Sequence, residues 1–412
     1  MVVVFGVIAL LALGVLVAGN WYLWRRLFRD TTRGPGLARR AGAAGIAAGW
    51  LLAVGAVVGE RAGAPFWLQQ VLAWPGFLWL ALSIYLLLGV VAGEVVRPLL
   101  RRLSERRAAT AALPQAQPVP AGSLPPKAPE AGPEPAPLPD PSRRLFVSRV
   151  VAGAAAAAAV GTVGYGTYGV LRGPRVKRVT VPLAKLPRAA HGYRIAVVSD
   201  IHLGPILGRG FAQKVVDTIN ATQPDIVAVV GDLVDGSVKN LGPAAAPLSQ
   251  LKAPSYFVTG NHEYFSGAAQ WVEEVRRLGL HPLENARTEL PWFDLAGVND
   301  LAGESEGQGP DFAKALGDRD TARACVLLAH QPVQIHDAVR HGVDLQLSGH
   351  THGGQLWPGN FIAAAANPTV AGLERYGDTQ LYVSRGAGAW GPPTRVGAPS
   401  DITVIELAST QA

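Results

Sequence analysis

Apolar residues dominate four segments in the first 171 residues of the chain, and each segment is long enough to cross a bilayer as a helix. The segments comprise residues 2–19, 41–59, 71–93 and 150–171. Trp21 and Tyr22 follow the first segment, and Arg25 and Arg26 come directly after them, which is the order expected at a membrane interface. The first segment lacks the preceding positive charge of a signal peptide, so we expect it to be an uncleaved anchor.

The pattern changes twice after the third apolar segment. Between residues 114 and 141, 11 of 28 residues are Pro, which predicts an extended linker without a core. From about residue 177, short β-branched runs alternate with helical patterns such as 211–222 and 268–278, as in an α/β domain. The predicted organisation is a three-helix transmembrane region (1–108), a Pro/Ala-rich linker (109–148), a fourth transmembrane or signal-anchor helix (149–172) and an α/β domain (177–412).

Five of the predicted strands end in, or just before, a group of polar residues. These strands are 194–199, 225–230, 255–259, 325–329 and 344–347. Loops at the carboxyl ends of strands commonly build the binding site of an α/β domain. Cys325, the single Cys of the chain, lies in one of these apolar runs, so we expect it to be a buried strand residue.

Charge separates the two halves of the chain. Residues 1–173 carry 17 Lys and Arg against 7 Asp and Glu, whereas residues 174–412 carry 20 against 23. The basic excess lies between the apolar segments, which suits membrane topology, and we expect no nucleic-acid binding. Placing the Arg-rich loops in the cytoplasm predicts a multi-pass protein of the cell (inner) membrane with an extracytoplasmic C-terminal domain. Four cations after the fourth segment argue for the opposite side: Arg172, Arg175, Lys177 and Arg178.

Arg143 and Arg144, just before the fourth segment, have two interpretations. With Ser142 and Leu145-Phe146-Val147 they resemble a twin-arginine export signal. Alternatively they are an ordinary cytoplasmic basic flank, because such export signals normally lie at the extreme N-terminus. The sequence leaves both open.

Five polar motifs hold five of the nine His residues of the chain. The motifs are Asp200-Ile201-His202, Gly231-Asp232-Leu233-Val234-Asp235, Gly260-Asn261-His262-Glu263, His330 and Gly349-His350-Thr351-His352. Their imidazole, carboxylate and amide donors suffice for two metal ions, and a carboxylate such as Asp232 can bridge a metal pair. Each motif alone is common in turns, but five in order after five strands indicate a two-metal hydrolytic centre. The other four His residues lack this context, and we expect them to be surface or structural residues.

The motifs resemble the signature blocks of the calcineurin-like metallophosphoesterase superfamily. The block Gly349-His350-Thr351-His352-Gly353-Gly354-Gln355 and the run 381–386 look like its membrane-anchored bacterial branch. The resemblance covers about residues 190–407 and implies a four-layer αββα sandwich with a dinuclear site on its rim. It makes 177–412 the predicted catalytic domain of a metal-dependent phosphoric ester hydrolase, preceded by an α-helical transmembrane region.

The resemblance also implies a role for each motif residue. Asp200, His202 and His352 would hold one metal ion and Asp232 would bridge. Asn261, His330 and His350 would hold the second ion. His262 would act as a general acid or stabilise the phosphoryl charge, and Asp235 would orient it. The donor set suits two divalent or trivalent ions, Mn, Fe or Zn, without selecting among them.

The predicted function is hydrolysis of a phosphomonoester or phosphodiester by a metal-bridging hydroxide. The expected partners are the lipid bilayer and a phosphoester substrate, and tethering near the bilayer favours a lipid-linked or envelope substrate; the sequence assigns no oligomeric state. Gly236 stands where the phosphoprotein phosphatase branch carries Arg, so a phosphoprotein substrate is disfavoured. The alternatives are a non-catalytic metal-binding membrane sensor or scaffold, and an enzyme whose site lies in the cytoplasm.

Overall fold

The computed structural model describes residues 2–111 and 141–411, and it divides into two units. The first unit comprises Met1–Trp50 and Leu82–Gly161, and the second comprises Leu51–Ala81 and Thr162–Ala412. Most of the predicted linker, residues 112–140, lies outside the described residues. The second unit contains the whole predicted α/β domain.

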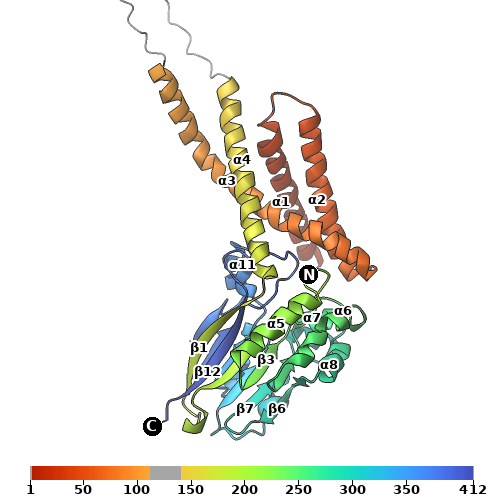
Figure 1. Cartoon of the computed structure of the whole chain (residues 1–412), viewed down its shortest axis with the longest axis vertical. Coiled ribbons are helices and arrows are strands. Elements are labelled where there is room, and N and C mark those ends of the chain that lie inside the picture. Colours follow the sequence, from red (N-terminus) through yellow and green to blue (C-terminus); the bar gives the residue numbers. More distant parts are fainter. Residues whose placement is uncertain (1, 112–140, 412) are drawn as a thin grey trace, which may run out of the picture. The chain divides into compact units, whose positions relative to one another are not determined.

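Four long helices contain the four predicted apolar segments (Figure 1). They are α1 (Val2–Trp24), α2 (Leu37–Arg61), α3 (Phe66–Ala111) and α4 (Pro141–Leu171). Within the described parts of the chain, three helical stretches are long and apolar enough to cross a membrane: Leu37–Arg61, Phe66–Leu100 and Arg144–Leu171. The span predicted over 2–19 lies on α1 and stays a prediction. Helix α4 begins at Pro141, so it extends back over residues that the sequence pattern assigned to the linker.

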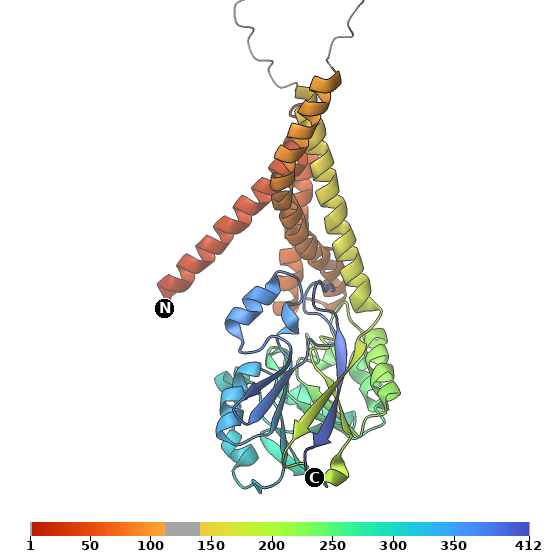
Figure 2. The same ribbon diagram turned by 90° about the vertical axis from the view of Figure 1, so that its left-hand side faces the viewer.

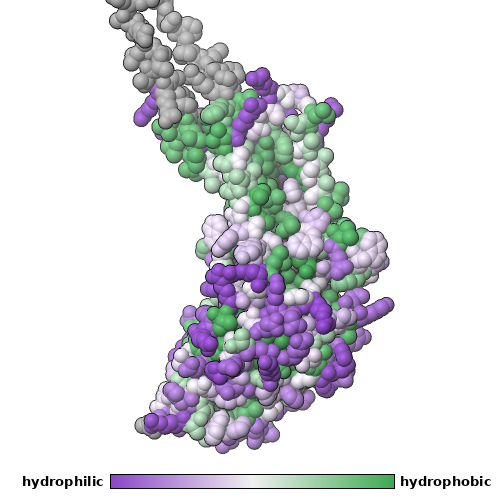
Figure 3. All heavy atoms as spheres, in the orientation of Figure 1, coloured by the Kyte–Doolittle hydropathy of each residue, from purple (hydrophilic) through white to green (hydrophobic). Residues whose placement is uncertain are grey.

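Polar contacts join the helices of the first unit. The indole Nε1 of Trp50 on α2 donates to Oδ1 of Asn20 on α1 at 2.7 Å. A π-helical turn, η1 (Arg25–Arg29), follows α1, and its Arg26 pairs with Glu94 of α3 at 2.8 Å. In the face drawn in Figure 3, hydrophobic residues predominate over the long helices and hydrophilic residues over the α/β domain.

Two six-stranded sheets form the α/β domain, and the two sheets face each other (Figure 2). In spatial order the first sheet contains β1 (Arg175–Leu183), β12 (Asp401–Ser409), β2 (Tyr193–Val198), β3 (Ile226–Val230), β4 (Ser255–Val258) and β5 (His281–Pro282). The second contains β10 (Gly372–Tyr376), β11 (Thr379–Val383), β9 (Leu345–Ser348), β8 (Cys325–Leu328), β7 (Asp294–Gly297) and β6 (Ala286–Glu289).

Helices cover the outer faces of both sheets. The α-helices of the domain are α5 (Arg209–Thr222), α6 (Val238–Ala245), α7 (Asn261–Ser266), α8 (Ala268–Arg277), α9 (Phe312–Leu316), α10 (Ile335–Arg340) and α11 (Gly359–Ala366). Short 3₁₀ helices are η2 (Arg188–Ala190), η3 (Ala246–Gln250), η4 (Leu301–Glu306), η5 (Pro332–Gln334) and η6 (His352–Gly354). This arrangement confirms the predicted αββα sandwich.

The strand pattern explains the layers. Along β2, Ile195 and Val197 pack into the core between the sheets, whereas Ala196 and Val198 pack against α5 and α8 on the outer face. Successive side chains of a strand point to opposite faces, so a strand buried on both faces is a continuous apolar run. Cys325 of β8 is fully buried against α9 and α10, as predicted.

Parallel pairing sets the position of the site. Strands β2, β3 and β4 run parallel in the first sheet, and β7, β8, β9 and β11 run parallel in the second. Parallel strands end at the same edge of a sheet, so the loops that follow them gather there. All five predicted motifs follow one of these strands and therefore lie on this edge.

Candidate metal centre

One group of predicted ligands combines the loop after β2 with the loop after β9. Oδ1 of Asp200 lies 3.4 Å from Nε2 of His352, and that Nε2 lies 3.0 Å from Nε2 of His202. All three residues are buried. Three donor atoms within 4.8 Å of one another can hold one metal ion.

A second group lies beside the first. Its carboxylate is Asp232, after β3, and its imidazoles are His330, after β8, and His350, after β9. Nε2 of His330 is 3.2 Å from Oδ2 of Asp232. Asn261 joins this group, because its Oδ1 lies 3.0 Å from Nδ1 of His350.

Asp232 connects the two groups. Its Oδ2, which is 3.2 Å from His330, is also 3.8 Å from Nε2 of His202 in the first group. The structure therefore brings all seven predicted ligands together, and it places Asp232 between the two groups. This is the position that a bridging carboxylate needs.

The donor geometry fits metal ions. Neighbouring ligand atoms on one ion, bound at about 2.1 Å, lie roughly 3.0–3.4 Å apart. The contacts of 3.0, 3.4 and 3.2 Å in the two groups fall in this range. In addition, Nε2 of His330 is buried and makes no hydrogen bond within the described part of the chain. A buried nitrogen without a hydrogen bond is costly, and a bound cation would satisfy its lone pair.

Burial and neighbouring charges together shift the pKa values of the residues in the second group. Burial alone would lower the pKa of His330, but Asp232 raises that pKa well above its usual value. Burial would raise the pKa of Asp232, yet His330 and His202 hold it well below its usual value. Burial and the neighbouring His330 lower the pKa of His350 to about 4, so this imidazole is neutral and can act as a ligand.

The ligand loops have an unusual backbone. Asp200, His202, Asp232, His350 and His352 all have positive φ, between 48° and 71°. They make up five of the eight non-glycine residues with positive φ in the described residues. The left-handed region costs free energy for such residues and persists where the surrounding structure imposes it. The chain therefore turns sharply at Asp200 and His202, directly after β2.

Glycines let the loops approach one another. A Cβ on Gly260 would collide with the carboxylate of Asp232, and a Cβ on Gly349 would collide with Ser199 and the carboxylate of Asp200. Only glycine lets the backbone come this close to the metal ligands. These two positions explain why glycine precedes Asn261 and His350.

His262 and Asp235 lie at the edge of the first group. Oδ1 of Asp235 is 2.7 Å from Nδ1 of His262 and 2.9 Å from Nδ1 of His202. These three side chains also offer donors within 4.8 Å of one another. Their contacts are hydrogen bonds through Nδ1, which leave Nε2 of each ring for other partners, so we assign them as a hydrogen-bonded cluster. The resemblance implied the contact of Asp235 with His262 but gave no contact of Asp235 with His202.

Electrostatics favour a protonated His262. Burial alone would lower its pKa, but the hydrogen bond and charge of Asp235 raise the pKa of His262 to about 9. Burial would raise the pKa of Asp235, whereas His202 and His262 lower it to about 2. An ionised Asp235 beside a protonated imidazole is the arrangement that fixes the ring orientation of a general acid.

The sequence did not predict the supporting roles of two residues, Glu263 and Arg395. The fully buried Glu263 accepts hydrogen bonds from the backbone N–H groups of Asp232, Leu233 and Gly260, at 3.0, 2.8 and 2.6 Å. Its carboxylate thereby joins the loops after β3 and β4. The capping-box position of Glu263, three residues after Gly260, was a local signal for this role.

Arg395 supports His352 from a loop 43 residues away. One guanidinium nitrogen donates to the carbonyl oxygen of His352 at 3.0 Å, and another lies 3.1 Å from Nδ1 of the ring. Nε of Arg395 donates to the carbonyl oxygen of Gly388 at 2.6 Å. The ring is thus held with Nε2 toward Asp200. No local pattern around Arg395 indicates this contact.

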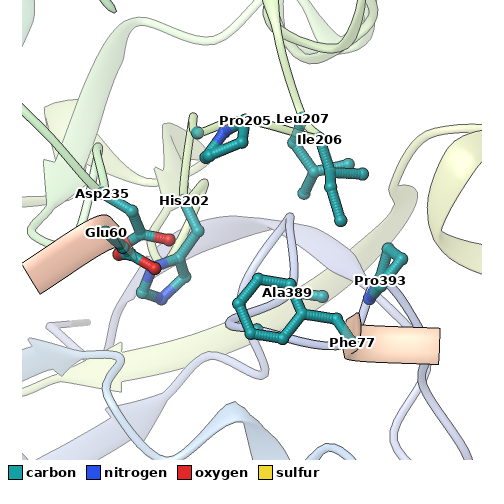
Figure 4. Close-up of a pocket in the computed structure, with 11 residues that line it drawn as sticks. Glu60, Phe77, His202, Pro205, Ile206, Leu207, Asp235, Ala389 and Pro393 are labelled. Carbon is teal, nitrogen blue, oxygen red and sulfur yellow. The ribbon is translucent and has the colours of Figure 1, made fainter. Parts of the chain in front are cut away.

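A pocket adjoins the first group, and two long helices contribute to its wall (Figure 4). Figure 4 shows the carboxylate of Glu60, near the end of α2, beside Asp235 and His202. Phe77 of α3 lies on the other side of the pocket. Glu60 and Phe77 belong to the same structural unit as the sandwich. The sequence pattern gave no reason to place either residue near the motifs.

Comparison with known proteins identifies the family. Residues 193–354 match the family described as calcineurin-like phosphoesterase. A metallophosphoesterase of Aquifex aeolicus, named as uncharacterized, is 35% identical over 240 residues, which cover 57% of this chain and 91% of that protein. A Bacillus subtilis protein, also named an uncharacterized metallophosphoesterase, is 30% identical over 285 residues, 65% of this chain and 98% of that protein. This chain belongs to the calcineurin-like phosphoesterase family.

Longer relatives of the family include membrane proteins. A Danio rerio protein named "Transmembrane protein with metallophosphoesterase domain" is 41% identical over 259 residues. The match covers 59% of this chain and 59% of that protein, so the chain spans little more than half the length of this relative. Membership confirms the predicted family, and the two groups of Asp and His donors support divalent metal ions as cofactors of its calcineurin-like phosphoesterase domain.

Proposed function

We propose that the chain is a membrane-anchored, metal-dependent phosphoesterase that hydrolyses phosphomonoesters or phosphodiesters. The observation that carries the proposal is the position of Asp232 Oδ2, at 3.2 Å from His330 and 3.8 Å from His202. One carboxylate oxygen is thus shared by two donor groups. A metal site with a merely structural role does not need a shared oxygen or two adjacent ions.

In this proposal each donor group supplies the ligands of one metal ion. Asp200, His202 and His352 would hold one ion, and Asn261, His330 and His350 the other, with Asp232 common to both. Mn, Fe or Zn, in divalent or trivalent form, suit this mixture of imidazole, carboxylate and amide donors. A bound pair of ions would lower the pKa of a water molecule and neutralise phosphate oxygens.

His262 supplies the proton for the leaving oxygen in this proposal. Its Nδ1 is held by Asp235 at 2.7 Å, so Nε2 is the atom that can donate to substrate. The pKa of about 9 keeps the ring protonated near neutral pH. Protonation of the leaving group by a positioned imidazole contributes about 10²–10⁴-fold to a rate.

A non-catalytic metal-binding sensor or scaffold is the rival hypothesis. It requires the ligands but not the pair of His262 and Asp235. The half-buried His262 is held by Asp235 beside the first donor group, where ligation alone gives it no role. This pairing favours the enzyme.

The proposal also includes the location of the catalytic domain relative to the membrane. The candidate spans support an anchor in the cell (inner) membrane, and the Arg-rich loops favour a domain outside the cytoplasm. The alternative is a cytoplasmic site. A reporter that is active only outside the cytoplasm, fused after residue 412, distinguishes the two. Nearness to the bilayer favours a lipid-linked or envelope phosphoester as substrate.

Hydrolysis by the full chain in detergent tests the proposal. p-Nitrophenyl phosphate and bis(p-nitrophenyl) phosphate would serve as monoester and diester, with Mn²⁺, Fe²⁺ or Zn²⁺ added to chelator-treated protein. Asp232→Asn should abolish metal-dependent turnover, and His262→Ala should lower kcat about 10²-fold or more while metal content stays unchanged. Bound metal without turnover in the unaltered chain would support the rival sensor.

A further inference from the structure

Large exposed apolar side chains lie on segments that follow the metal-binding motifs and on the loop after β11. We define the apolar rim as Trp357, Phe361, Ile362, Trp390 and Phe265. Phe361, Ile362 and Phe265 are 65%, 76% and 75% exposed. The rings of Trp390 and Phe265 lie 5.7 and 5.6 Å from the ring of His262. Two members of the rim, Trp390 and Phe265, therefore border the residue assigned as general acid.

Helix α11 carries the most exposed part of the rim. Its sequence, Gly-Asn-Phe-Ile-Ala-Ala-Ala-Ala, contains no charged residue, and none of its residues is buried. A helix on the surface of a soluble domain normally turns an apolar stripe to the core and charged residues to water. Exposed apolar patches of this kind mark interaction surfaces. The composition of α11 is therefore typical of a surface that is in contact with an apolar environment and not with water.

Hydrogen bonds fasten the rim to the end of α4. The amide of Gln355, just before α11, exchanges hydrogen bonds with the backbone of Trp390 at 2.9 and 3.0 Å. The hydroxyl of Thr167 on α4 lies 2.7 Å from that of Thr394 in the same loop as Trp390. The N–H of Arg395 donates to the carbonyl oxygen of Gly166 at 3.4 Å. The loops that carry the rim are therefore bound to the last turns of a candidate membrane span.

The same end of α4 has the side chains of a membrane interface. Tyr165 and Tyr168 are 75% and 64% exposed, and Tyr is enriched where a span meets the headgroups. Three exposed cations follow the helix directly: Arg172, Arg175 and Arg178. Basic residues next to a span attract anionic headgroups. The end of α4 is thus suited to lie at a membrane interface, and its hydrogen bonds join it to the loop that carries Trp390.

The pocket beside the metal ligands is consistent with this surface. Its wall includes Glu60 and Phe77, which lie in the candidate spans Leu37–Arg61 and Phe66–Leu100. Phe77 packs with Ala56 and Ala73 of these spans and contacts Ile206 of the sandwich. Two spans besides α4 therefore reach the site itself.

We propose that the apolar rim lies in the headgroup layer of the bilayer that α4 crosses, and that the mouth of the metal centre opens onto that layer. Resting on the proposed phosphoesterase function, the inference extends to the substrate: the phosphoester is carried by a membrane amphiphile that reaches the site from the same leaflet. A rim of Trp, Phe and Ile would take up the first acyl methylenes, while the phosphate reaches the donors behind it.

Fluorescence quenching tests the surface independently of activity. Ile362→Cys in the full chain is labelled with an environment-sensitive fluorophore in nanodiscs of phosphatidylethanolamine and phosphatidylglycerol. The buried Cys325 should take no label, which the unaltered chain checks. Trp292→Cys is the matched control, because Trp292 is 40% exposed and precedes β7 at the opposite edge of the sheet.

The expected result is selective contact with lipid. Spin-labelled lipid should quench the probe at residue 362 strongly and the probe at residue 292 weakly, with blue-shifted emission only at residue 362. Equal quenching at both positions would overturn the proposal. A blue-shifted probe at residue 362 that lipid does not quench would also overturn it, because a second copy or another protein would then cover the rim.

Turnover tests the substrate class. The double variant Phe361→Ser/Ile362→Ser should hydrolyse phosphatidic acid or phosphatidylglycerol in nanodiscs about tenfold more slowly, with unchanged turnover of p-nitrophenyl phosphate. Equal loss on both substrates would overturn a lipid-specific role of the rim. Turnover of the soluble ester without turnover of either lipid would overturn the amphiphile, whereas no turnover of any ester would contradict the phosphoesterase function itself.

Discussion

Glu263 gives the sharpest test of how the metal centre is held together. Its two carboxylate oxygens accept three buried N–H groups: Oε2 from Asp232 and Gly260, and Oε1 from Leu233. Glu263→Gln keeps the shape of the side chain but replaces one acceptor by an NH₂ donor. The best orientation retains the two bonds of Oε2 and turns the new donor against the N–H of Leu233.

The cost follows from two unpaired donors, the N–H of Leu233 and the new NH₂ group, because Glu263 is fully buried. A buried N–H without an acceptor costs about 1–3 kcal/mol, so the two together cost about 2–6 kcal/mol. For a domain of this size, each kcal/mol corresponds to a change of about 2–4 °C in Tm, so we expect Glu263→Gln to lower Tm by about 4–24 °C. Metal affinity should also fall, because the backbone of the bridging Asp232 loses part of its support.

Thermal unfolding of the full chain in detergent, with and without Mn²⁺, measures both effects. Glu273→Gln is the matched control, because the side chain of Glu273 is 72% exposed and its pair with Arg276 should contribute less than about 1 kcal/mol. If Glu263→Gln left Tm and metal affinity as little changed as the control does, the assigned role of Glu263 would be refuted.

Three further predictions concern other supports of the fold and the site. Arg395→Met should weaken the binding of one metal ion about 10–100-fold in a metal titration; unchanged affinity would show that Arg395 does not position His352. Gly349→Ala should lower both Tm and metal content, whereas Gly208→Ala, which meets open space, should change neither; tolerance of Gly349→Ala would contradict the close approach of the loops. Burial raises the pKa of Cys325 to about 12, so the thiol should resist a maleimide at pH 8 until the chain unfolds; rapid modification of the folded protein would show that it is accessible.

The strands of the α/β domain and the meeting of their loops at one edge were predictable from the sequence for a physical reason, whereas the four-layer sandwich and the role of each ligand were implied by the resemblance to the calcineurin-like superfamily. A strand buried on both faces has a continuous apolar sequence, so the runs before Asp200, Asp232 and His330 mark strands directly. Parallel strands then bring their following loops to one edge. Local patterns of a few residues, combined with this rule, were enough to bring the five motifs to one two-metal centre, and the resemblance then selected seven donors among them.

The missing parts depend on distant contacts. Arg395 reaches His352 only because the loop after β11 folds back over the site, and nothing near Arg395 in the sequence marks that path. The contact of Asp235 with His202, 33 residues away, likewise depends on the register of two neighbouring loops. Glu60 is a polar residue at the end of an apolar helix. This position predicts a residue at the membrane interface, whereas in the structure Glu60 lines the pocket.

Anomalous diffraction from crystals of the full chain grown with Mn²⁺ would test the central claim most directly. The account predicts two peaks about 3.5–4 Å apart, one among Asp200, His202 and His352 and the other among Asn261, His330 and His350, with Asp232 bound to both. A single peak, or two peaks of which only one contacts Asp232, would contradict the proposed two-metal centre.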